Sequence, residues 1–122
     1  MPQITLEYSS NIKQSVNFPE LFSLVHQNLH QVGGIHIEHC KSRAIKCKRF
    51  CVGNGDSHNA FIHLQIRLLQ SPDRTEEFKQ QVGQTTLELI KKYYQPSCDS
   101  HALQITVQVD DLPLSYYKYA SQ

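Results

Sequence analysis

The first half of the chain combines a strand pattern with a helix pattern. Ile4, Leu6 and Tyr8 are separated by polar residues, which is the period-two pattern of a strand with one buried face. A helix over residues 18–32 is predicted next, because Asn17 offers a cap and apolar residues then recur at helical spacing. Gly33-Gly34 ends this helix, since glycine tolerates positive φ.

The second half has the same order of elements. A strand over about residues 42–52 precedes Gly53-Asn54-Gly55-Asp56, whose Asn-Gly dipeptide favours a tight hairpin. The next strand, about residues 59–69, is therefore expected to pair antiparallel with it. The capping sequence 73–76 and the apolar spacing after it predict a helix that Pro96 ends near Tyr94. The last predicted strand covers residues 103–109.

The repeat of capping sequences at residues 17–20 and 73–76 divides the chain into two strand–helix–strand halves. Each half requires a parallel crossover, which is right-handed almost without exception. We therefore expect an α+β fold in a single domain over residues 1–122: a duplicated βαβ arrangement whose four-stranded mixed sheet carries two helices on one face. Apolar residues on the bare face, such as Phe61 and Leu69, and a tail containing Tyr116, Tyr117 and Tyr119 without an obvious partner in its own subunit indicate a symmetric oligomer.

Charge and hydropathy exclude several classes of protein. Twelve Lys and Arg against 11 Asp and Glu give a net charge of +1, which argues against a polyanion partner. A small module that stacks nucleic-acid bases would need exposed aromatics among the cations, and only Phe50 and Phe61 qualify. No run approaches the roughly 20 apolar residues of a membrane span, and the first residues lack a signal-peptide pattern. We expect a soluble, cytoplasmic protein.

The cysteines and histidines do not form a recognisable metal motif. Without a secretory signal, the four cysteines are expected to be thiols. His26 and His30 stand four residues apart on the predicted helix, and Cys47 and Cys51 are close in sequence, but no CxxC and no nearby acid completes either pair. We therefore expect a solvent-facing histidine pair and no metal. The chain also has no Gly-rich phosphate loop and no Ser or Cys nucleophile motif.

Pro2 is the first candidate for catalysis. Removal of Met1 would leave its nitrogen as a secondary amine, held rigidly at the start of a strand. A free α-amino group has a pKa of about 7.7 to 8. Nearby cations or desolvation lower that pKa, so the amine could accept and return protons near neutral pH. A retained Met1 would make the nitrogen an amide without a basic lone pair. The alternative interpretation is an ordinary processed terminus.

Cations supply the second set of candidates. Lys41, Arg43, Lys46, Lys48 and Arg49 fall within one stretch that contains no acid. In a strand, Lys41, Arg43 and Arg49 would lie on one face and Lys46 and Lys48 on the other. Such a stretch is either a solvated strand that resists edge aggregation or an anion-binding surface.

Arg74 is a further cation in the first turn of the second predicted helix. Backbone N–H groups and the helix dipole favour anions there, so Arg74 either helps to hold a carboxylate or is a surface residue.

Five short segments together resemble one family across nearly the whole chain. They are Pro2-Gln-Ile-Thr-Leu-Glu-Tyr-Ser-Ser-Asn-Ile12, Lys41-Ser-Arg43, Ala60-Phe-Ile-His63, Gln80-Gln-Val-Gly83 and Leu87-Glu-Leu-Ile90. Their order and spacing resemble 5-carboxymethyl-2-hydroxymuconate Δ-isomerase, of the tautomerase superfamily. The resemblance implies a trimer of βαβ-duplicated subunits that needs no cofactor and acts in homoprotocatechuate degradation, a bacterial route of aromatic catabolism.

The resemblance also implies roles for individual residues. Pro2 would move a proton between the enol oxygen and a carbon of a polycarboxylate dienol, and Arg74 would bind a substrate carboxylate. Lys41 stands where the family carries an arginine, so the charge is kept but the bidentate fork is lost. Arg43 matches a second arginine of the same motif. The alternative function is a non-catalytic trimeric relative that keeps the fold and binds a small carboxylate.

Overall fold

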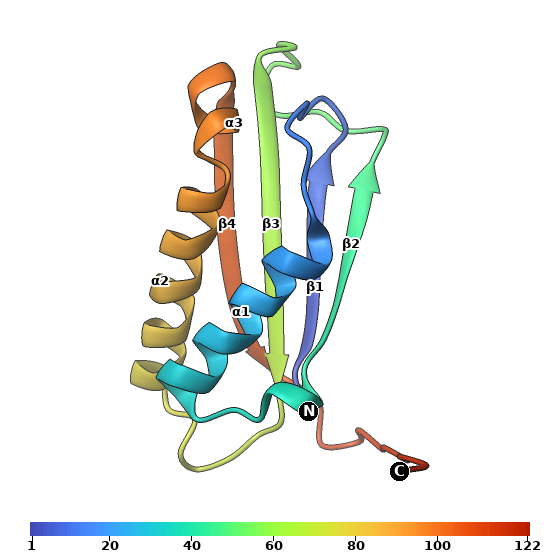
Figure 1. Cartoon of the computed structure of the whole chain (residues 1–122), viewed down its shortest axis with the longest axis vertical. Helices are drawn as coiled ribbons and strands as arrows, with labels where there is room; N and C mark the ends of the chain where they lie inside the picture. Colours follow the sequence, from blue (N-terminus) through green and yellow to red (C-terminus); the bar gives the residue numbers. More distant parts are fainter.

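Four strands form one mixed sheet in the computed structural model, which describes residues 1–122 (Figure 1). The elements are β1 (Gln3–Ser9), α1 (Phe18–Gly33), the 3₁₀ turn η1 (Ile37–His39), β2 (Lys41–Cys47), β3 (Asn59–Leu68), α2 (Glu76–Tyr93), α3 (Gln95–Ser100) and β4 (Ala102–Asp111). The order across the sheet is β2-β1-β3-β4. β1 is parallel to β2, β3 is parallel to β4, and β1 and β3 are antiparallel. The expected α+β fold with two βαβ halves is confirmed.

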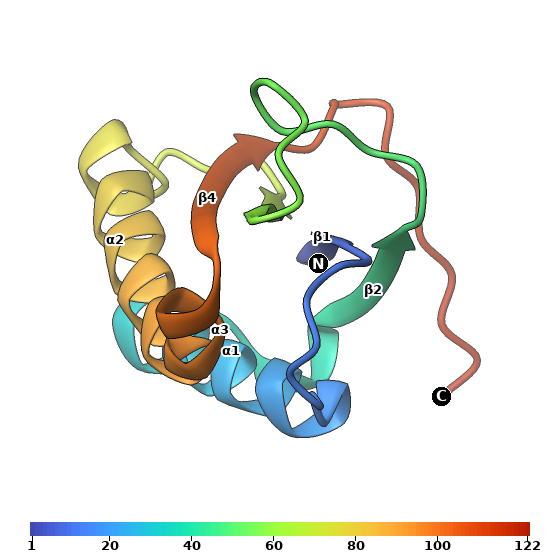
Figure 2. The ribbon, with the colours of Figure 1, turned by 90° about the horizontal axis from the view of Figure 1, so that it is seen from above.

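The core lies between the sheet and the helices, which cover one face (Figure 2). Leu6 of β1 is paired with Leu64 of β3, and both side chains are fully buried. The helices add the apolar positions that their spacing predicted: Leu21, Val25 and Leu29 from α1, Val82 and Ile90 from α2. Full burial of such a side chain contributes roughly 1.5–3 kcal/mol to the free energy of folding. These buried residues come from both halves of the chain, so their packing stabilises the contact between the halves.

The first predicted helix cap is confirmed and the second is displaced. The Asn17 side chain accepts a hydrogen bond from the backbone N–H of Glu20 at 3.1 Å. In the second helix Thr75, and not Asp73, is the cap, and it accepts from the N–H of Phe78 at 3.2 Å. The backbone N–H of Asp73 donates to the Ser71 hydroxyl instead, within the preceding turn. Arg74 therefore lies just before the cap, and its predicted place in the first helical turn is wrong.

The predicted hairpin between the second and third strands is wrong. β1 lies between β2 and β3, which do not pair with each other, and β2 ends at Cys47 rather than at Val52. The turn itself exists, with positive φ at Gly53 and Gly55. A local turn reverses the chain but does not choose its partner strand. The parallel crossover places β2 on one side of β1, and the apolar β3 then takes the other side.

The second helix ends close to Tyr94, as predicted, but Pro96 lies in a further short helix that the sequence did not predict. α2 ends at Tyr93, and α3 begins two residues later with Pro96 in its first turn, where a missing N–H costs nothing. The buried Ser97 of α3 donates its hydroxyl hydrogen to Oε1 of Gln14 at 2.6 Å. The second half is therefore longer than the simple repeat predicts. None of the helices is long and apolar enough to cross a membrane.

The sheet face opposite the helices is mainly polar, so the expectation of an apolar bare face is wrong. Register places the following polar residues on it: Gln3, Thr5 and Glu7 of β1, His63, Gln65 and Arg67 of β3, and Gln104, Thr106 and Gln108 of β4. Ile45 and the half-buried Phe61 are the apolar exceptions, and Leu69 lies beyond the end of β3. A partner protein on this face would contact mainly hydrogen-bonding side chains rather than an apolar surface.

Candidate active site

The start of the chain is fixed at one end of the sheet. Pro2 is buried, and its carbonyl oxygen accepts a hydrogen bond from the backbone N–H of Lys41 at 3.1 Å. Gln3 and Lys41 begin the β1–β2 register, so the parallel ladder reaches back to the residue before the strand. The loop before α2 and the C-terminal tail lie at the same end (Figure 1). The terminus is therefore bonded to β2 at the end of the sheet where the loop before α2 and the tail also lie.

The terminal amine lies in an environment that disfavours its proton. The pKa of the Met1 amine lies below its ordinary value of 8.0, mainly because burial desolvates it. Arg74 and then Lys41 lower that pKa further by charge repulsion, Cys40 raises it, and Lys118 lowers it by the smallest amount. Three cations from separate segments thus converge on the chain terminus. An amine at this point is neutral more often near pH 7 than an ordinary terminus.

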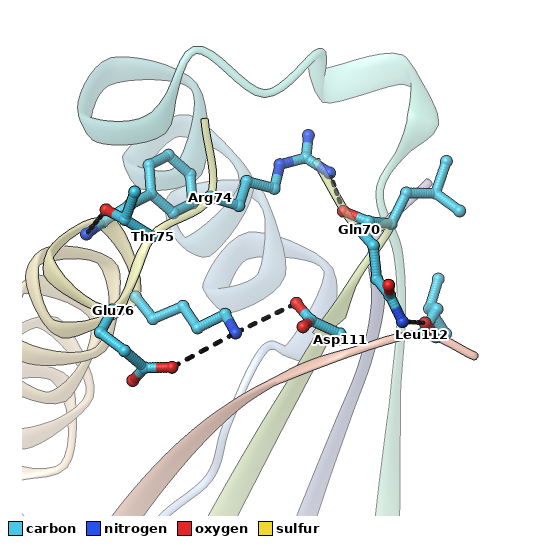
Figure 3. Close-up of polar contacts among 9 residues, drawn as sticks. Gln70, Arg74, Thr75, Glu76, Asp111 and Leu112 are labelled. Carbon is cyan, nitrogen blue, oxygen red and sulfur yellow. Dashed lines mark hydrogen bonds and ion pairs between the residues drawn. The ribbon is translucent and has the colours of Figure 1, made fainter. Parts of the chain in front are cut away.

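Arg74 reaches this end from the loop between β3 and α2. Its side chain is half-buried and donates a hydrogen bond from Nη1 to the carbonyl oxygen of Leu69 at 2.7 Å (Figure 3). The remaining N–H groups of the guanidinium stay available for an anion. Lys79 secures the neighbouring helix start, because its Nζ lies 3.1 Å from Oδ1 of Asp111 on β4 (Figure 3). These two interactions therefore fix the backbone on both sides of Arg74 before any ligand binds.

Lys41 and Arg43 occupy different places, although they share β2. The exposed Lys41 side chain donates to the carbonyl oxygen of His39 at 3.1 Å and lies close enough to the terminus to affect the amine. Arg43 lies opposite Thr5 on the open face of the sheet, and its guanidinium donates to Oε1 of Gln3. The structure thus brings Pro2, Lys41 and Arg74 to one end, and Arg43 lies two residues further along β2 on the same face as Lys41.

Two surface hollows flank Arg43, and neither includes Pro2. One of about 500 Å³ lies between α1 and β2, where Phe22, His26 and Ser42 line it. The other, of about 420 Å³, lies on the open face and is lined by Gln65 and Tyr116 among others. Gln3, the residue after Pro2, lines the second hollow and not the first.

A family model described as 5-carboxymethyl-2-hydroxymuconate isomerase matches residues 2–121. The chain belongs to this family of isomerases. A relative from Escherichia coli, 5-carboxymethyl-2-hydroxymuconate Delta-isomerase, is 26% identical over 112 residues, which are 92% of this chain and 87% of the relative. The sequence resemblance to this family is confirmed.

Solved structures agree with the fold. A 5-carboxymethyl-2-hydroxymuconate isomerase from Deinococcus radiodurans R1 has a TM-score of 0.84 at 20% identity, over 97% of this chain and 88% of that chain. A structure described as a fused 4-OT wild type symmetric trimer has a TM-score of 0.73 at 11% identity, over 98% of this chain and 92% of that chain. At these identities the likeness establishes a shared fold.

The other cations of the β2 region do not reach the chain terminus of this isomerase. Lys46, Lys48 and Arg49 are exposed. Lys48 and Arg49 follow the end of β2, so the predicted division of the stretch between two strand faces is wrong beyond Cys47. These residues fit the interpretation of a solvated edge rather than that of a substrate site.

The histidines and cysteines form no metal site. His26 is half-buried and its Nε2 lies 2.7 Å from the Ser42 hydroxyl, whereas His30 is exposed and its Nδ1 lies 3.0 Å from the carbonyl oxygen of Ile35. The expectation of a solvent-facing pair is therefore wrong for His26, whose pKa is lowered by burial. No group of three or more His, Cys, Asp or Glu side chains could hold a metal ion, and all four cysteines are free thiols.

Lys118 is the residue at this end that the sequence did not single out. Its Nζ lies 3.0 Å from Sδ of Met1. Two residues earlier, the Tyr116 hydroxyl accepts a hydrogen bond from Nε2 of Gln3 at 2.9 Å, so the expectation that the tyrosine tail lacks a partner in its own subunit is wrong for Tyr116. A single lysine in an unpatterned tail has no period or spacing that would reveal it.

Proposed function

We propose that this family member isomerises 5-carboxymethyl-2-hydroxymuconate or a closely similar polycarboxylate dienol, with the Pro2 amine as acid and base once Met1 has been removed. The observation that carries the proposal is the convergence of Arg74 and Lys41 on a buried chain terminus. The name of the Escherichia coli relative supports the choice of substrate. The proposed reaction belongs to homoprotocatechuate degradation, as the family resemblance implies, and its proposed location is the cytoplasm.

The proposed reaction is a balanced proton shift. The neutral Pro2 amine takes the proton of the enol hydroxyl, so the O–H bond breaks and a dienolate forms. The resulting ammonium returns the proton to a carbon of the dienolate, where a C–H bond forms and the carbonyl is restored. The amine is neutral again at the end, and no redox partner is consumed. The burial and cations that lower the pKa of the Met1 amine would act in the same direction on a Pro2 amine at this end of the sheet and favour its proton-accepting form.

Arg74 and Lys41 are the proposed carboxylate-binding groups. The guanidinium of Arg74 presents a planar set of donors that can grip a carboxylate with two hydrogen bonds, whereas the ammonium of Lys41 acts as a point charge. Both charges also stabilise negative charge that develops on the substrate oxygen during the shift. Arg43, already bonded to Gln3 on the open face, would contribute where a second subunit extends the site.

A homotrimer is the proposed assembly. The fused 4-OT symmetric trimer shares this fold, and a symmetric partner on the open face would place new walls beside the hollow at Arg43. The polar side chains of that face favour an interface rich in hydrogen bonds rather than an apolar one. The expected homotrimer would therefore be held together by polar contacts rather than by burial of an apolar face.

The test is a turnover assay on protein shown by intact mass to lack Met1. The dienol is supplied and its isomerisation is followed by ultraviolet absorbance. We expect turnover by the wild-type protein, partial activity in Pro2→Ala, which keeps a less rigid primary amine, and none after acetylation of the Pro2 nitrogen. A Met1-free protein that binds the dienol without converting it would contradict the proposal and favour a non-catalytic carboxylate-binding relative.

A further inference from the structure

The C-terminal tail is bound back onto the start of the chain. Leu112 is buried, its backbone N–H donates to the carbonyl oxygen of Leu68, and its own carbonyl oxygen accepts from Nε2 of Gln70 at 3.2 Å (Figure 3). The Tyr116 hydroxyl then accepts from Gln3 at 2.9 Å. These two anchors direct the tail across the end of the sheet toward the terminus.

Lys118 is the point at which the end of the tail touches the body of the molecule. Lys118 is exposed, as are Tyr117 and Tyr119, but its ammonium lies 3.0 Å from Sδ of Met1. None of the three salt bridges in the chain involves Lys118. A thioether sulfur is a weak acceptor, so the ammonium is held in place without a strong partner.

Lys118 adds positive charge near the terminal amine, although its effect on the pKa of that amine is the smallest of the contributions. Lys118 joins Arg74 and Lys41 near the terminal amine, and His39 and Cys40 are the other titratable groups that face it. No carboxylate contributes to the electrostatic environment of that amine. Removal of Met1 would also take away the sulfur that Lys118 contacts. A cation left without an acceptor beside other cations is arranged to receive a negatively charged ligand.

We propose that Lys118 is a substrate-binding residue, whose ammonium holds one carboxylate of a polycarboxylate substrate at the Pro2 end of the sheet, with Tyr116 and Gln3 as its positioning pair. This inference rests on the proposed function, because it takes Pro2 as the reacting end of the site. Arg74, Lys41 and Lys118 come from three separate segments, so each can meet a different carboxylate. The tail would thereby select substrates with several carboxylates over those with one.

The test compares Lys118→Met, which keeps the length and removes the charge, with Lys118→Arg, which keeps the charge. Lys48→Met, an exposed lysine beyond β2, is the matched control. Each Met1-free variant is assayed with the polycarboxylate dienol and with phenylenolpyruvate, which has one carboxylate. For Lys118→Met we expect KM for the dienol to rise about 5- to 10-fold. This loss lies between the binding free energy of an exposed ion pair and that of a charged hydrogen bond. We expect less than about a twofold change for phenylenolpyruvate, and recovery in Lys118→Arg.

Two further measurements separate binding from structure and from catalysis. Calorimetric titration with adipate, an unreactive dicarboxylate, should show the same loss in Lys118→Met whether or not the protein turns over substrate. The kinetic pKa of the amine should also rise in Lys118→Met, because one repelling charge is gone. Failure of turnover with loss of adipate affinity would refute the proposed reaction and keep this site. Unchanged adipate affinity in Lys118→Met, with or without a lower thermal midpoint, would overturn the inference.

Discussion

The carbonyl oxygen of Pro2 and the backbone N–H of Lys41 form a hydrogen bond of 3.1 Å that joins the chain terminus to the first residue of the edge strand. The bond fixes the position of residue 2 before any ligand is present. It also brings the Lys41 side chain to the terminus without help from side-chain packing. A base on residue 2 would therefore be preorganised by backbone geometry, which side-chain substitutions leave intact.

The pH dependence of catalysis should report a lowered amine pKa. Because burial and three cations disfavour the protonated form, the Met1-free enzyme should gain activity as pH rises through a pKa below the roughly 7.7 to 8 of an ordinary terminus. The measurement is kcat/KM as a function of pH. Lys41→Ala should shift this kinetic pKa upward, whereas Arg49→Ala, an exposed cation beyond β2, should leave it unchanged. An activity that falls across this range would show that a protonated acid is required instead.

Arg74→Ala should weaken the binding of dicarboxylate inhibitors far more than it disturbs the fold. The loss of a charged hydrogen-bonding group costs roughly 1.5–3 kcal/mol, which is about 10- to 150-fold in Kd. The fold should survive, because the guanidinium is only half-buried and donates one hydrogen bond, to Leu69. Calorimetric titration and thermal unfolding together check this. An unchanged Kd with a collapsed midpoint would make Arg74 a structural residue.

The position of the second helix cap can be tested by a pair of alanine substitutions. Thr75→Ala should destabilise the protein by about 1 kcal/mol, because the N–H of Phe78 loses its acceptor. Asp73→Ala should change the free energy of unfolding very little, since its side chain accepts no hydrogen bond at the helix start. Urea unfolding of both variants shows which substitution lowers the free energy of unfolding more. A larger loss in Asp73→Ala would reinstate the cap that the sequence pattern favoured.

The oligomeric state gives a prediction about the open face. Light scattering at micromolar concentration should give three times the chain mass of 14.1 kDa. Ile45→Glu should lower that mass, because Ile45 is 46% exposed on the open face and would bring a charge into the proposed interface. Leu24→Glu is the matched control, since Leu24 is 38% exposed on α1. A wild-type protein with the mass of one chain would contradict the proposed trimer.

Local patterns were sufficient for most of the fold. Alternation placed Leu6 and Leu64 on the core face, and the Asn17 cap marked the start of α1, because each signal is encoded within a few residues. Strand order is not local. The turn at Gly53 and Gly55 is compatible with any partner for the strand that follows, and the choice of β1 depends on burial across the whole sheet.

The candidate site was predictable only where a residue sits at a structural boundary. Pro2 directly precedes β1, Lys41 begins β2 and Arg74 precedes a helix cap, so sequence position already indicated that they lie at element ends. Arg43 lies on the same face of β2 as Lys41 but two residues further from the terminus, and it bonds Gln3, a contact that depends on strand register. Lys118 reaches the terminus through a tertiary contact of the tail, which no pattern in the sequence encodes.

The central claim is that the free nitrogen of Pro2 carries the proton. Protein that retains Met1 and protein treated with methionine aminopeptidase, each verified by intact mass, are assayed side by side with the same enol substrate. We predict that turnover rises in proportion to the fraction of chains that lack Met1 and is absent from the retained form, because the Pro2 nitrogen of that form is an amide without a basic lone pair. Equal turnover by the two forms would contradict the claim and require a different base.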